Sequence, residues 1–99
     1  MRIRASVQSM LSGTRLNELP LMYHWLLQNS SDQVLFDLES TEAFQYFDPV
    51  AESTSYKITC EMLNDSRVVI NTLYADVITP SSITVENVPT AALRVIYEN

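Results

Sequence analysis

Few residues in this chain have side chains suited to chemistry, and none lies in a recognisable catalytic motif. His24 is the only histidine, so a metal site built from several histidines is excluded, and no nucleophile stands in a context that would pair with it. The chain contains no CxxC or HExxH pattern and no glycine-rich loop that would cradle a phosphate. We therefore predict a non-enzymatic protein with no cofactor and no metal, in which His24 is a hydrogen-bonded or surface residue.

The single cysteine and three neighbouring acids are the remaining candidates. Cys60 excludes an internal disulfide, and because it falls on the apolar side of an alternating segment we expect an inert core residue rather than a nucleophile. Asp37, Glu39 and Glu42 could supply a general acid or a metal ligand. Asp37 and Glu39, however, fall on the polar side of an amphipathic segment, where solvated carboxylates are expected.

Charge is distributed unevenly along the chain, whose formal net charge is −6. Residues 1–17 contain three of the six basic residues and no acid, whereas residues 18–99 contain all twelve acids. We interpret residues 1–17 as a basic N-terminal strand or arm with a connector, and residues 18–99 as the body of the domain.

This asymmetry predicts docking between protein subunits. The basic segment is expected to reach the acidic face of a neighbouring copy, which would favour a multi-copy, head-to-tail assembly; compensation of charge within one chain is the alternative. An acidic body argues against direct nucleic acid binding, because neutralising phosphates needs a basic surface. The predicted interaction residues are Arg2, Arg4, Arg15, Asp37, Glu39 and Glu42.

Length and composition fit one domain in a multi-subunit setting. Ninety-nine residues form a single domain, and only 18% are charged, against about 25% in typical domains. Either part of the surface is buried against partners, or uncharged polar residues cover it. The first ten residues alternate in polarity instead of forming a signal peptide, and no apolar run approaches the roughly 20 residues of a membrane span. We expect a protein outside membranes, in the cytoplasm or in a virion.

The elements that must position these residues are β-strands. The segment TSYKITCEML alternates with the period of two that a half-buried strand requires; its apolar face consists of Tyr56, Ile58, Cys60 and Met62. The cluster NDS (64–66) favours a turn, and RVVINTLYADV is predicted as the returning strand of a hairpin. On that strand, Val68, Ile70 and Tyr74 are predicted to share a face.

Four more segments alternate, and the FQYF segment (44–47) before Asp48-Pro49 adds a short strand. The apolar sides of the four segments are Ile3, Ala5 and Val7; Val34, Phe36 and Leu38; Ile83 and Val85; and Leu93, Val95 and Tyr97. The chain has one glycine, so most turns must be longer or built on Asn and Asp. We therefore expect both glycosylation-like sequons, at Asn29 and Asn64, to be turns.

Residues 19–28 are ambiguous. As a strand, Leu21, Tyr23, Trp25 and Leu27 share a face; as a short helix, the segment carries an apolar stripe with Pro20 near its start. The strand is the preferred interpretation because it forms a hairpin with the following strand. With it, seven or eight short strands predict an all-β protein, a single antiparallel β-sandwich of Ig-like or jelly-roll-like type.

Two stretches resemble known β-sandwich modules. WLLQNSSDQVLFDLE (25–39) is similar to a hairpin of immunoglobulin-like modules, and TSYKITCEML resembles the Tyr-x-apolar-x-apolar strand of fibronectin type III domains. The resemblance implies a sandwich and no particular activity. Small sandwiches without cysteine pairs or signal peptides also resemble accessory proteins of bacteriophage particles, such as capsid decoration, neck or tail components.

The function predicted from the sequence is therefore a structural or assembly protein of that kind, which binds other subunits through strand faces and the basic arm. A small acidic inhibitor or immunity-type protein that occupies a basic site on an enzyme is the first alternative. A ligand-binding sandwich, such as a carbohydrate module, is the second. It would need exposed aromatic residues, whereas we expect most aromatic side chains to lie in the core; the candidates are Tyr23, Trp25, Phe44, Tyr46 and Phe47.

Overall fold

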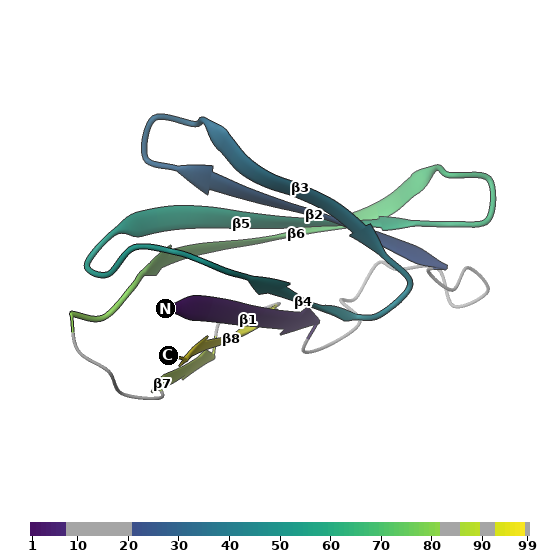
Figure 1. The fold of residues 1–99 in the computed structure, drawn as a ribbon. Coiled ribbons are helices and arrows are strands. Elements are labelled where there is room, and N and C mark those ends of the chain that lie inside the picture. The colour runs from purple at the N-terminus through teal and green to yellow at the C-terminus, as the bar shows by residue number, and fades with distance from the viewer. Residues whose placement is uncertain (8–20, 82–85, 90–92, 99) are drawn as a thin grey trace.

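The computed structural model describes residues 1–7, 21–81, 86–89 and 93–98. These residues form eight β-strands in two four-stranded antiparallel sheets, which lie as two layers of a small β-sandwich (Figure 1). The strands are β1 (Arg2–Val7), β2 (Met22–Asn29), β3 (Val34–Ser40), β4 (Phe44–Phe47), β5 (Ser55–Leu63), β6 (Val69–Ile78), β7 (Glu86–Pro89) and β8 (Leu93–Glu98). The predicted all-β class and antiparallel sandwich are confirmed.

Each sheet joins strands that are far apart in the sequence. The β1 sheet has the order β4-β1-β8-β7, and the β5 sheet has the order β3-β2-β5-β6. In the β1 sheet, the first and last described strands pair along their whole length, from Arg2 opposite Glu98 to Val7 opposite Leu93. In the β5 sheet, β2 pairs with β3 on one side and β5 on the other. The part of residues 19–28 that the structure describes is therefore a strand from Met22 onward, and the helical alternative is wrong there.

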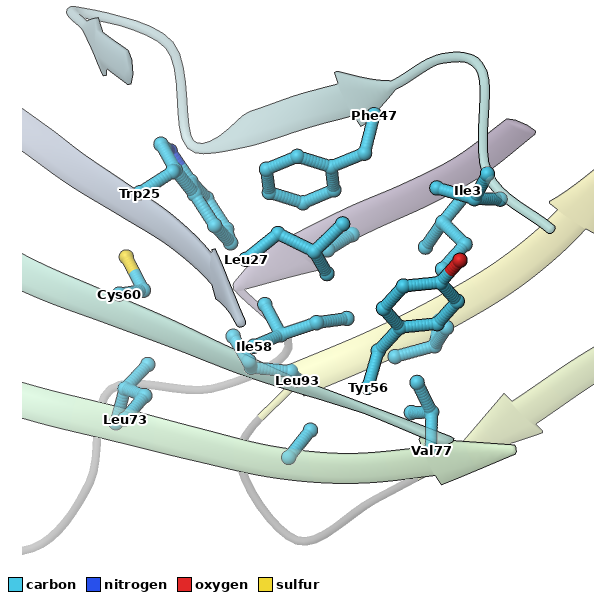
Figure 2. Close-up of a cluster of buried hydrophobic side chains, with 14 of the residues drawn as sticks. Ile3, Trp25, Leu27, Phe47, Tyr56, Ile58, Cys60, Leu73, Val77 and Leu93 are labelled. Carbon is cyan, nitrogen blue, oxygen red and sulfur yellow. The ribbon is translucent and has the colours of Figure 1, made fainter. Parts of the chain in front are cut away.

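The core lies between the sheets, where the alternating apolar residues of both layers meet. Ile3 and Ala5 from β1, Leu93 and Val95 from β8, and the apolar face of β5 are all buried. Figure 2 shows Trp25 and Phe47 together in this core; their ring centroids are 6.4 Å apart in an edge-on arrangement that suits aromatic quadrupoles. Cys60 of β5, opposite Trp25, is fully buried, as predicted.

Two asparagines form the hairpin turns. The Oδ1 atom of Asn29 accepts hydrogen bonds from the backbone N–H groups of Ser31 and Gln33, at 2.9 and 3.0 Å. Asn64 repeats the arrangement in the β5–β6 turn, where Ser66 and Val68 donate. The backbone of Asp32 and of Arg67 has φ near +60°, the left-handed conformation that a three-residue hairpin loop needs and that glycine usually supplies. The prediction of asparagine-based turns is confirmed.

One strand face differs from the prediction. Leu73, Ala75 and Val77 point into the core of the sandwich, whereas Tyr74 is exposed. Met62 pairs with Asn71 and Leu63 pairs with Val69, so Ile70 is the extra residue of a β-bulge. A one-residue insertion moves every following side chain to the opposite face. The predicted common face of Val68, Ile70 and Tyr74 is therefore wrong.

The predicted strand at Ile83 and Val85 lies outside the described residues, as does Arg15. Within the described ranges, the chain forms no helix with the length and apolarity that a membrane crossing requires.

Candidate interaction surfaces

The outer surface of the β1 sheet gathers arginine and aromatic side chains. Because Ile3 and Ala5 point into the core, Arg2 and Arg4 point out, and the register sets Arg4 opposite Tyr46 of β4. Arg94 of β8 is exposed on the same surface, opposite Ser6. We call this surface the basic face; it consists of Arg2, Arg4, Phe44, Tyr46 and Arg94.

The two N-terminal arginines lie over aromatic rings. The Arg2 guanidinium is 4.6 Å from the centroid of Tyr46 and donates a 2.6 Å hydrogen bond to Glu98, which raises the pKa of Arg2. The Arg4 guanidinium is 5.1 Å from the centroid of Phe44. Within the described ranges Arg4 forms no ion pair, and its Nε is buried without a hydrogen-bond acceptor. Stacking on rings fixes the guanidinium orientation and leaves its terminal N–H groups for an acidic partner.

The outer surface of the β5 sheet carries the opposite charge. Its outward positions include four carboxylates: one from β5, one from β6 and two from β3. The lysine and arginine side chains on this surface are those of Lys57 and Arg67. Arg67 lies at the β5–β6 turn and pairs with Glu39 at 2.6 Å. We call this surface the acidic face; its carboxylates are Asp37, Glu39, Glu61 and Asp76.

His24 links two of these carboxylates across three strands. Its Nδ1 lies 2.7 Å from Oε1 of Glu61 on β5, and its Nε2 lies 2.5 Å from Oδ1 of Asp37 on β3. Burial alone would lower the pKa of His24, but the hydrogen bonds and charges of the two carboxylates outweigh it and raise the pKa above 6.5. Both ring nitrogens are occupied, so neither is free to act as a general base.

The structure separates the predicted interaction residues by sheet. Arg2 and Arg4 belong to β1, which lies between β4 and β8 and is an inner strand of the sandwich rather than a free arm. Asp37 and Glu39 lie on the acidic face of the other sheet, and Glu42 is exposed in the β3–β4 connection. Arg2 and Arg4 thus lie on the opposite side of the molecule from Asp37 and Glu39. Sequence reasoning missed Glu61, Arg67 and Arg94, because only the strand register brings them to these surfaces.

Other candidates offer less chemistry. Burial, with a smaller contribution from Glu61, raises the pKa of the Cys60 thiol to about 12, so it stays protonated and unreactive. Trp25 is fully buried, which contradicts an aromatic ligand surface built on it.

A hollow of about 380 Å³ lies where β2, β5 and β6 meet the β2–β3 turn, and Lys57 and Asp76 lie on its lining. No group of three or more potential metal ligands occurs in the part of the chain that the structure describes.

Comparison of the chain with protein-family models, with curated proteins and with solved structures finds no significant match. The resemblance to immunoglobulin-like and fibronectin type III modules therefore stays a prediction.

Proposed function

We propose that this protein is a non-enzymatic assembly subunit whose copies stack, with the basic face of one copy on the acidic face of the next. The observation that carries the proposal is the opposite charge of the two outer surfaces of one sandwich. Arg2, Arg4 and Arg94 lie on the outer surface of one sheet, where Arg2 pairs with Glu98. The other sheet presents four carboxylates against Lys57, Arg67 and His24, whose charged form two of the carboxylates stabilise.

The geometry supports a head-to-tail arrangement. The two layers of the sandwich carry these faces on their outer sides, so the faces point away from each other (Figure 1). A contact between two different surfaces of the same protein repeats from copy to copy, forming a ring where the rotation closes and a filament where it does not. Arg4 supplies a pre-oriented guanidinium, and Asp37, whose side chain is 64% exposed, supplies a carboxylate that can accept from it.

Sedimentation velocity tests the proposal. Wild-type protein should form larger species at low ionic strength and lose the face-to-face contact at about 1 M salt, where the Debye length falls to about 3 Å. Arg4→Glu should weaken association at low salt, because it puts a carboxylate opposite carboxylates. Lys57→Glu is the matched control, because it changes net charge equally but strengthens the acidic face; it should associate at least as well as wild type. Equal weakening by both variants, or no low-salt association of wild type, would refute stacking.

A second candidate function uses the acidic face alone. Three of its carboxylates, those of Asp37, Glu39 and Glu61, are held in place by His24 and Arg67, so the face could occupy a basic site on a partner, as an acidic inhibitor does. This alternative predicts a monomer at every salt concentration, with no effect of Arg4→Glu on sedimentation.

A further inference from the structure

The β6 strand is an unusual sheet edge. It is ten residues long, the longest strand described, and in that part of the chain only β5 pairs with it. The two edges of the β1 sheet, β4 and β7, have four residues each. An edge strand presents unpaired N–H and C=O groups to any extended chain. Natural sheets therefore use short edge strands, place charged side chains on them, or cover them with another element. β6 has one charged residue, Asp76, and its exposed side chains include Val69, Tyr74 and Ile78.

We propose that β6 pairs in an antiparallel manner with β6 of a second copy, so that two β5 sheets join into one eight-stranded sheet. This contact is separate from face stacking, because it uses the side of the sheet rather than its surfaces. In a dimer with a two-fold axis, the same segment of β6 in each copy pairs with its counterpart in the other copy.

Charge favours a second copy at this edge over the other edge of the same sheet. Asp76 lies opposite Lys57 on β5, so the β6 edge carries little net charge in a chain of −6. The β3 edge instead carries Asp37 and Glu39, which would face like charges on an approaching copy. Lys57 also lies 5.3 Å from the ring centroid of Tyr74, which holds this ring over the outer surface near the edge.

The register follows from the regular part of the strand. Beyond the bulge at Ile70, the β5–β6 ladder is uninterrupted. A two-fold axis at Tyr74 sets Tyr74 against its own copy, Asp76 against the Thr72 hydroxyl, and Leu73 against the small Ala75. Outward residues thus meet outward residues, aromatic meets aromatic, and no carboxylate meets another.

Cysteine cross-linking in about 1 M salt, where face stacking is screened, tests the inference on the full chain. Tyr74→Cys should give a disulfide-linked dimer on oxidation, because directly opposed residues lie about 4.5–5.5 Å apart between Cα atoms. Thr72→Cys and Asp76→Cys are matched controls; each is four residues from its own copy, about 13 Å, and should not cross-link. Wild-type protein, in which Cys60 is buried, shows how much cross-linking occurs without an introduced cysteine.

A dimer from Tyr74→Cys alone would support the pairing. No dimer from this variant, or equal dimer from all three, would overturn it. Light scattering in the same salt gives a second reading: wild type and Tyr74→Phe should be dimers, and Tyr74→Lys, which opposes two ammonium groups at the axis, should be a monomer. A wild type that stays monomeric in high salt would also overturn the pairing while leaving the stacking proposal standing.

Discussion

At the scale of single residues, His24 shows how a histidine can be ordered without being reactive. It lies on β2 between β3 and β5, and each ring nitrogen contacts a carboxylate of the neighbouring strand. Glu39, directly opposite His24 on β3, is engaged by Arg67. The imidazolium form can donate to both Asp37 and Glu61, so these partners stabilise the charged state.

This arrangement predicts a pH-dependent contribution to stability. The pKa of His24 is raised on folding, so the folded state holds the proton more tightly, and the stabilisation is fully present below the unfolded pKa of 6.5. It is lost as the pH rises through the raised folded pKa. Urea unfolding at about pH 6 and about pH 8.5 should show wild type more stable than His24→Gln, with the larger advantage at the lower pH. An equal advantage at both pH values would contradict the charged bridge.

The asparagine turns give a second prediction at this scale. Asn29→Ala removes the acceptor for the backbone N–H groups of Ser31 and Gln33, and we expect a loss of about 1–2 kcal/mol in the free energy of unfolding. Asn64→Ala, which removes the equivalent acceptor in the other turn, should cost a similar amount. Ser30→Ala, an exposed change in the same turn as Asn29, should stay within about 0.5 kcal/mol. Chemical denaturation checks all three; an Asn29→Ala loss as small as that of Ser30→Ala would contradict the role of the side chain.

At the scale of elements, alternation in the sequence predicts most strands, because one face of each meets a single core. The face from Tyr56 to Met62 is buried as predicted. The orientation of β6 was not predictable, since the bulge at Ile70 arises from its pairing with β5 and carries no periodic signal. The sequence shows which charged residues exist but not which of them share a surface. The hydrogen bond from Arg2 to Glu98 joins residues 96 positions apart, and such pairing depends on the order of strands in the sheet, which periodicity does not encode.

The inner position of β1 also changes how the N-terminal segment is understood. Its arginines owe their common orientation to Ile3 and Ala5, which are buried in the core. Removing β1 would therefore remove a strand that pairs on both sides, as well as the charges. Substitutions of Arg2 and Arg4, rather than truncation, separate binding from folding.

At the scale of the whole molecule, the sandwich carries two oppositely charged surfaces back to back, and one long edge of low net charge. Stacking would extend the assembly perpendicular to the sheets, and pairing through β6 would extend it within a sheet. Salt distinguishes the two contacts, because screening weakens ion pairs and leaves backbone pairing largely intact.

The most direct test of stacking is a charge-swapped mixture. One variant, Arg2→Glu/Arg4→Glu, would have two acidic faces, and another, Asp37→Lys/Glu61→Lys, would have two basic faces. Circular dichroism should first show that both keep the β-sheet spectrum of wild type. In sedimentation velocity at low ionic strength, neither variant should stack with itself, and an equimolar mixture should form larger species that contain both. A mixture that sediments as the sum of its separate components would contradict the account.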